Sequence, residues 1–101
     1  MSAYVLAVID VKDVEKYKNY AAGAPATVEA FGGRYLARNG NKHPLEGNVF
    51  GNRVVILEFP SVEAATRWYH SEEYQGVKRK REGAAMGDIF VIEGYAEARA
   101  S

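Results

Sequence analysis

The chain has 101 residues, and its 13 basic and 13 acidic side chains give a formal net charge of zero. This length fits one domain, residues 1–101, and the balanced charge gives no electrostatic reason to expect nucleic acid or a membrane surface as a partner. With no cysteine, disulfides and thiolate metal sites are excluded. Because residues 1–10 have neither a basic leader nor a long apolar run, we expect a cytoplasmic protein.

The first third of the chain predicts a strand followed by a long helix. Tyr4–Ile9 is apolar and rich in β-branched residues, which favours a strand. Asp13 is a suitable N-cap for a helix from Val14 to about Phe31, in which apolar residues recur every three or four positions and share one face. Pro25 inside this helix removes one backbone donor, so we expect a kink there.

The middle of the chain predicts two strands separated by a long loop. Gly32 and Gly33 end the helix and lead into a strand at Arg34–Arg38. Asn39–Asn52 is rich in Gly, Pro and Asn and predicts the loop, and Arg53–Phe59 is the next strand. Loops of this length are more often functional than idle, so we expect this one to lie beside a pocket or a partner subunit, with Leu45, Glu46 and Phe50 making the contacts.

The last third predicts two short helices and a final strand. Ser61 is a cap for a helix at residues 62–69. Ser71 is a second cap, for a helix from Glu72 to about Arg81, and Ile89–Ile92 is the last strand. The resulting order is βαββαβ.

This order is that of the ferredoxin-like fold, an α+β architecture of four antiparallel strands with the helices on one face. The strands are apolar on both sides, but two helices cover only one face of a sheet. We therefore expect a second copy of the chain to cover the other face, and predict a homodimer joined sheet to sheet. The sequence does not show which side of each strand faces the helices.

Several short blocks resemble one known family. They are Tyr4-Val5, Tyr17 with Tyr20, Gly32–Arg38, Leu45–Gly47, Val55–Ser61, Trp68-Tyr69, Ser71 with Glu73-Tyr74, and Glu93-Gly94. On these residues the chain is similar to the family of domains of unknown function numbered 1330, over nearly its whole length. The resemblance implies a dimeric α+β barrel whose two sheets enclose a lumen, and it implies no particular reaction. Related barrels include cofactor-free monooxygenases, lactone isomerases and haem enzymes.

Two residues depart from the family pattern. Asn39 replaces a glycine that is common in the family, and His70 stands where a small polar residue is usual. A function tied to the loop or to the junction of the two short helices would then be particular to this protein.

Charged residues within the strands are the first candidates for a binding site. Strict alternation places Arg34 and Arg38 on one side of their strand and Tyr35 on the other, and Glu58 interrupts an otherwise apolar strand. In the functional interpretation, Arg34, Arg38 and Glu58 project into the lumen and hold an anionic or polar small molecule. In the structural interpretation, they form ion pairs at the sheet edge or across the dimer.

Aromatic residues supply a second group of candidates. Trp68 and Tyr69 are adjacent on a helix and point about 100° apart, so we expect one of them to reach a cleft or the dimer interface. Four tyrosines are suited to line a ligand pocket with them, namely Tyr17, Tyr20, Tyr35 and Tyr74. Packing in the core or the interface is the alternative.

The histidines add acid–base candidates. His43 and His70 are each followed within three residues by a glutamate, but neither spacing is diagnostic. The candidates for catalysis are Arg38 as an electrostatic stabiliser and Glu58 or His70 as an acid or base. Because a metal needs further ligands and the chain has no cysteine, we expect no metal and no cofactor.

The run Lys78–Arg81 is the one cluster of like charge in the sequence. Four cations at the end of a helix are stabilised by the negative end of its dipole, so they need no nucleic acid to explain them. The strand Arg53–Phe59 has no glycine and one aromatic residue, unlike the third strand of RNA-binding domains with this order.

Three functions fit these observations. The first is a cofactor-free enzyme that acts on a small aromatic or carbonyl-containing compound in the lumen. The second is a ligand-binding or sensing dimer with the same pocket and no turnover. The third is an assembly module without a ligand.

Overall fold

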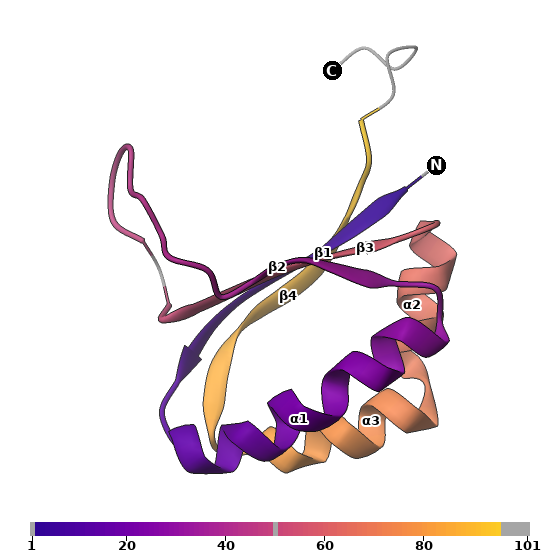
Figure 1. Cartoon of the computed structure of the whole chain (residues 1–101), viewed down its shortest axis with the longest axis horizontal. Helices are drawn as coiled ribbons and strands as arrows, with labels where there is room; N and C mark the ends of the chain where they lie inside the picture. The colour runs from indigo at the N-terminus through magenta and orange to yellow at the C-terminus, as the bar shows by residue number, and fades with distance from the viewer. Residues whose placement is uncertain (1, 50, 96–101) are drawn as a thin grey trace.

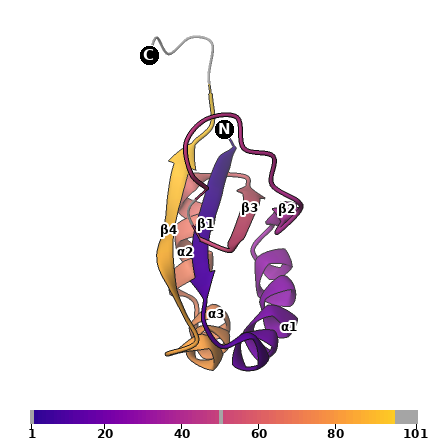
Figure 2. The ribbon, with the colours of Figure 1, turned by 90° about the vertical axis from the view of Figure 1, so that its left-hand side faces the viewer.

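The computed structural model describes residues 2–49 and 51–95. Its elements are β1 (Ala3–Val11), α1 (Val14–Ala30), β2 (Arg34–Arg38), β3 (Arg53–Phe59), α2 (Val62–His70), α3 (Glu72–Lys78), the short 3-10 helix η1 (Arg79–Arg81) and β4 (Ala85–Glu93). The strands form one antiparallel sheet in the order β2-β3-β1-β4. Figures 1 and 2 show that the helices cover one face of this sheet. The predicted βαββαβ order and ferredoxin-like fold are confirmed.

The last strand begins four residues before its predicted start at Ile89. Met86, Gly87 and Asp88 lack an apolar strand pattern, yet they continue the ladder with β1 as far as the pair Val11 and Ala85. The partner strand sets this boundary, because strand formation depends more on neighbouring strands than on local propensity.

Side chains cap the helices as predicted. Asp13, Ser61 and Ser71 each accept a hydrogen bond from the backbone N–H three residues further on, at 3.0–3.1 Å. At the end of α1, Gly32 has a φ of +80°, which a residue with a side chain rarely adopts. Gly33 is needed for space, since an added Cβ would lie 2.6 Å from Cε1 of Phe59.

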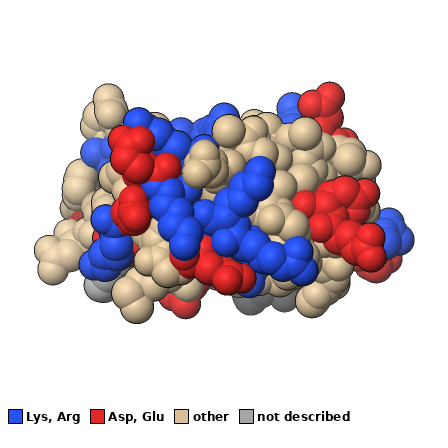
Figure 3. All heavy atoms as spheres, turned by 90° about the horizontal axis from the view of Figure 1, so that it is seen from below, with Lys and Arg blue, Asp and Glu red and all other residues tan. Residues whose placement is uncertain are grey.

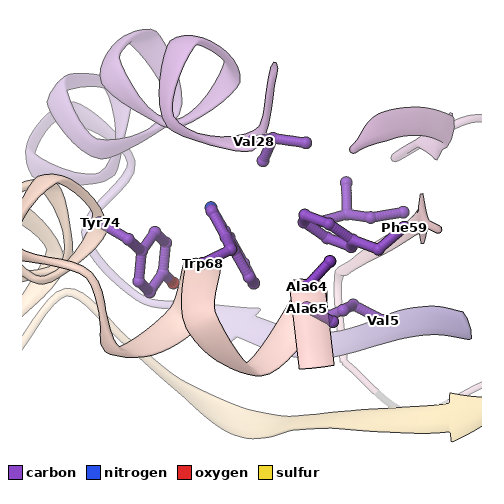
Figure 4. Close-up of a cluster of buried hydrophobic side chains, with 8 residues drawn as sticks. Val5, Val28, Phe59, Ala64, Ala65, Trp68 and Tyr74 are labelled. Atoms are coloured by element: carbon purple, nitrogen blue, oxygen red, sulfur yellow. The ribbon is translucent and has the colours of Figure 1, made fainter. Parts of the chain in front are cut away.

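The core lies between the sheet and the helices. Val5, Leu57 and Phe59 point from the sheet toward α1 and α2, and the rings of Phe59 and Trp68 lie 5.3 Å apart between their centroids. Figure 4 labels Val5, Phe59 and Trp68 together with the other members of the cluster, which are Val28, Ala64, Ala65 and Tyr74. Because side chains alternate along a strand, the neighbours of Val5 and Leu57 point to the opposite face.

That opposite face, which we call the open face, carries apolar side chains and no helix. Leu6 lies at its centre, opposite Ile56 on β3 and Phe90 on β4. Phe90 is 47% exposed and Ile92 is 51% exposed. The predicted apolarity on both sides of the strands is therefore present, and a monomer leaves a large apolar surface in water.

The loop between β2 and β3 is fixed at both ends. Asn39 has a φ of +54°, a conformation that asparagine tolerates and glycine adopts freely, which explains the exchange of these residues. Asn52 forms two hydrogen bonds with the backbone of Val11, at 2.8 and 3.0 Å. Most of the described residues between these ends are exposed, with Leu45 at 96%. Figure 1 shows the loop extending from the sheet on the side away from the helices. Phe50 lies outside the described residues.

Shortening this loop is expected to weaken dimerisation. Replacing residues 41–50 with a tight turn removes the exposed apolar Leu45 and Val49. The loop that carries them extends on the side away from the helices, where a partner would cover the open face. Light scattering across a dilution series measures the dimer, and thermal unfolding checks that the sheet is retained. A shortened chain with unchanged dimerisation and ligand binding would exclude a role of the loop at both the partner subunit and the pocket.

Candidate functional site

A small cavity lies between the helix-covered face of the sheet and α1. Its volume is about 30 Å³, room for one or two water molecules. Aliphatic residues form much of the wall, and the side chains with polar or aromatic groups are Tyr17, Tyr20, Tyr35, Arg38, Arg53 and Trp68. We call this space the inner cavity.

A wider hollow of about 350 Å³ opens beside the inner cavity. Tyr17, Ala21 and Arg53 line both spaces and therefore form the wall between them. Asn39 and Asn52, the two ends of the long loop, also line this entrance hollow. Its volume falls within the usual range for small-molecule sites.

A β-bulge brings Arg38 to the inner cavity. Tyr35 pairs with Leu57 and Arg38 pairs with Val55, because the register between β2 and β3 shifts after Tyr35. An extra residue in the strand reverses the alternation, so Tyr35 and Arg38 both lie on the helix-covered side. The prediction that strict alternation separates Arg38 from Tyr35 and groups it with Arg34 is wrong for this reason.

Arg38 also compensates for the proline in α1. Helix α1 continues through Pro25, which has no backbone N–H to donate to the carbonyl of Ala21 four residues earlier. Nη2 of Arg38 donates to this carbonyl oxygen at 2.6 Å. The Arg38 guanidinium also lies over the ring of Tyr35, 5.2 Å from its centroid. Arg38 therefore connects β2 to the middle of α1.

Arg53 is the second cation of the inner cavity. Its guanidinium lies over the ring of Tyr17, 5.2 Å from the centroid, and its buried Nε has no hydrogen-bond partner among the described residues. Burial raises the pKa of Tyr17, and the nearby charge of Arg53 offsets part of this shift. Burial likewise raises the pKa of Tyr35, opposed by Arg38 and Arg53.

Arg53 was not among the site residues predicted from the sequence. The signal was present, because alternation places Arg53 on the same side of its strand as Leu57 and Phe59, both of which are buried. A charged residue in the buried phase of a strand needs a partner or a ligand.

Tyr20 joins the inner cavity to α3. Its hydroxyl is hydrogen-bonded to that of Tyr74 at 2.8 Å, and Nη2 of Arg81 donates to the Tyr74 hydroxyl at 3.4 Å. Burial and the neighbouring Tyr74 raise the pKa of Tyr20 far above its ordinary value. Tyr20 therefore stays protonated at any physiological pH.

Trp68 contributes to both the core and the cavity. It is 3% exposed, and its Nε1 donates to Oγ1 of Thr27 at 3.0 Å. The Thr27 hydroxyl donates in turn to the carbonyl of Ala24 at 2.7 Å. This chain of bonds fixes the indole ring, which is the chain's one tryptophan and lies at the cavity wall.

The other predicted site residues lie elsewhere. Nε of Arg34 contacts Oε1 of Glu58 at 2.7 Å, on the opposite side of the sheet from the inner cavity. The hydrogen bond from Arg34 lowers the pKa of Glu58. This pair matches the structural interpretation of an ion pair at the sheet edge, and the structure does not bring it to Arg38.

Tyr69 and His70 lie in a separate groove between α2 and β4. The groove has a volume of about 220 Å³ and includes Phe90 and Val91 in its lining. The rings of Tyr69 and His70 lie edge to face, with their centroids 5.3 Å apart. His70 is exposed, as is His43 in the loop. Of the predicted site residues, the structure therefore groups five at the inner cavity and places the rest outside it; the five are Tyr17, Tyr20, Tyr35, Arg38 and Trp68.

The helix-covered surface carries charges of both signs. Figure 3 shows Lys and Arg side chains gathered across its middle, with Asp and Glu adjoining them. The run Lys78–Arg81 occupies the end of α3 and η1. Among the described residues, no cluster of three or more histidine or carboxylate side chains is arranged to hold a metal ion. None of the helices in the described part of the chain is both long and apolar enough to cross a membrane.

The fold and its helix-side cavity define a ferredoxin-like α+β protein. The chain belongs to the DUF1330 family, a domain of unknown function, whose model matches residues 2–95. No curated protein has a significantly similar sequence.

Solved structures of other proteins show the same fold. A protein of unknown function from Rhodopseudomonas palustris has 18% identity and a TM-score of 0.75, over 94% of this chain and 83% of that one. SnoaB, a cofactor-independent oxygenase from Streptomyces nogalater, has 9% identity and a TM-score of 0.64, over 94% of both chains. A dimeric protein of unknown function with a ferredoxin-like fold from Bacteroides fragilis has 13% identity and a TM-score of 0.60, over 92% of this chain and 96% of that one.

Proposed function

We propose that this protein binds a small aromatic or carbonyl-containing molecule in the inner cavity and the entrance hollow, without a cofactor. The observation that carries the proposal is the set of aromatic rings from Tyr17, Tyr20, Tyr35 and Trp68 around a cavity whose wall is shared with an open hollow. Aromatic side chains with polar groups suit a planar ligand that also accepts hydrogen bonds.

The ligand fits this space in two parts. The entrance hollow has room for the body of a small molecule, while the inner cavity has room for a group the size of one or two waters. Movement of Tyr17 or Arg53 joins the two spaces, because both side chains lie in the shared wall. This location differs from the expected lumen between two sheets, since the cavity lies on the helix-covered side within one chain.

A second candidate function is that the protein also converts the bound ligand chemically. The inner cavity offers arginine and phenol groups, which stabilise negative charge on an oxygen but do not accept a proton near neutral pH. Glu58 and His70 do not line it. Similarity in fold to a cofactor-independent oxygenase supports turnover, with the base supplied by water or by the substrate itself. Ligand binding without turnover is the alternative.

Blocking the entrance is expected to weaken ligand binding. Ala21 lies in the wall between the two spaces, so Ala21→Leu fills the passage, whereas Ala22→Leu adds the same volume on the exposed side of α1. The single Trp68 reports occupancy through its fluorescence during titration with a panel of small aromatic and carbonyl compounds. We expect Ala21→Leu to weaken binding at least tenfold and Ala22→Leu to leave it within twofold. Equal ligand affinities of Ala21→Leu and Ala22→Leu would refute the location of the binding site at the inner cavity and the entrance hollow.

The protein is further proposed to be a homodimer joined through the open face. The apolar side chains around Leu6 have no cover within the chain, and a neighbour of the same fold is a dimer. A partner seated there leaves the inner cavity accessible, because the cavity lies on the other side of the sheet. A cytoplasmic location stays a prediction.

A further inference from the structure

We infer that the ligand is an aromatic acid whose ionised oxygen, either a carboxylate or an acidic phenolate, is bound by Arg53. This inference rests on the proposed function and specifies the charge of the ligand and the residue that selects it.

The charges around the site are all of one sign. Arg38 and Arg53 line the inner cavity, Lys18 lines the entrance hollow, and among the described residues that line either space none is acidic. Lys18 has a partner in Glu15 at 3.2 Å. Within residues 2–49 and 51–95, neither Arg38 nor Arg53 forms an ion pair with a carboxylate. The site therefore favours an anion.

The two arginines differ in the hydrogen bonds that they already make within the protein. Arg38 already donates to the carbonyl of Ala21, which holds its guanidinium to the helix. Arg53 stands in the shared wall, with its buried Nε unpartnered among the described residues and its guanidinium lying over Tyr17. A partly buried cation with an unused donor is costly unless an anion binds it, and the fork of donors in a guanidinium suits an oxyanion. Arg53 is thus the recognition residue and Arg38 a supporting charge.

The aromatic rings specify the rest of the molecule. The rings of Tyr17 and Tyr20 lie 5.1 Å apart beside Arg53, and Tyr35 and Trp68 complete the wall. A ligand with a planar ring next to its anionic oxygen can contact the aromatic wall and Arg53 at the same time. Burial raises the pKa of Tyr17, Tyr20 and Tyr35, so these phenols stay uncharged and do not neutralise the arginines.

Matched pairs of probes test the charge. The carboxylate pair is 4-nitrobenzoate with methyl 4-nitrobenzoate, and the phenolate pair is 4-nitrophenol, titrated at a pH where it is ionised, with 4-nitroanisole. Trp68 fluorescence, corrected for probe absorption, gives each affinity. We expect the anion of at least one pair to bind roughly tenfold more tightly than its neutral partner. The pair that discriminates identifies which acid the site accepts.

Substitution of Arg53 tests the residue. In Arg53→Gln, we expect the affinity for the preferred anion to fall roughly ten- to a hundredfold and that for the neutral partner to stay within twofold. Arg34→Gln is the matched control, because Arg34 lies on the other side of the sheet, and it should change neither. If Arg53→Gln does not fold, the wild type still tests the charge of the ligand, because the neutral and ionised probes are compared on it alone.

The outcomes separate this inference from the proposed function. Equal binding of the anionic and neutral probes to the wild type, or equal weakening of both in Arg53→Gln, would refute the claim that the site selects an anion. The cavity would remain a binding site. Anion selectivity that survives in Arg53→Gln overturns the role of Arg53. If neither the matched probes nor any compound of the aromatic and carbonyl panel binds the wild type, both proposals fail.

Discussion

A single charge at the centre of the open face is expected to convert the dimer to a monomer. Leu6 lies opposite Ile56 and Phe90, so Leu6→Lys places an ammonium in the middle of the proposed interface, twice in a symmetric dimer. Burying an unpaired charge costs several kcal/mol, which corresponds to dimerisation at least a hundredfold weaker. Light scattering at micromolar concentration should give twice the 11.1 kDa chain mass for the wild type and one chain mass for the variant.

Ala22→Lys is the control for this change, because Ala22 is exposed on α1 and lies on the helix-covered side. It adds the same charge and should leave the dimer intact. A wild-type mass near that of one chain would rule out the dimer without any variant. A Leu6→Lys protein that remains dimeric would place the interface on another surface.

Removing the Arg38 side chain is expected to destabilise the protein in a way that depends on Pro25. Arg38→Ala leaves the carbonyl of Ala21 without the donor that α1 cannot supply, at a cost of about 1–2 kcal/mol or a fall in melting temperature of roughly 5–10 °C. In a Pro25→Ala background, the N–H of residue 25 can bond to this carbonyl. The cost of Arg38→Ala should then fall by half or more, as a double-mutant cycle measures.

Lys80→Ala is the comparison for this prediction. Lys80 is exposed in η1 and one of four neighbouring cations, so its loss should change the melting temperature by no more than about 2 °C. An Arg38→Ala protein as stable as Lys80→Ala would show that the bond to Ala21 contributes little. An equal cost of Arg38→Ala with and without Pro25 would show that Arg38 acts through Tyr35 or another contact instead.

Local chemistry in the sequence was sufficient to predict the elements and their order. Caps at Asp13, Ser61 and Ser71 and the break at Gly32 depend on backbone groups a few residues away, so the sequence contains the whole explanation. The apolarity of the strands on both sides predicted an uncovered face, because the number of helices fixes how much of a sheet is covered. The aromatic residues that line the inner cavity were all among the predicted candidates, whereas the candidates Tyr69 and Tyr74 lie outside it.

The site itself was decided by the tertiary structure. The bulge after Tyr35 exists only in the pairing of β2 with β3, and it moves Arg38 to the helix-covered side, away from Arg34 and Glu58. Ala21 and Arg53 form a shared wall only when α1 packs against β3. Register and packing join residues far apart in the chain, and a one-residue shift reverses the side on which a strand residue points. For this reason the sequence alone indicated candidate residues, and the fold determined which of them meet.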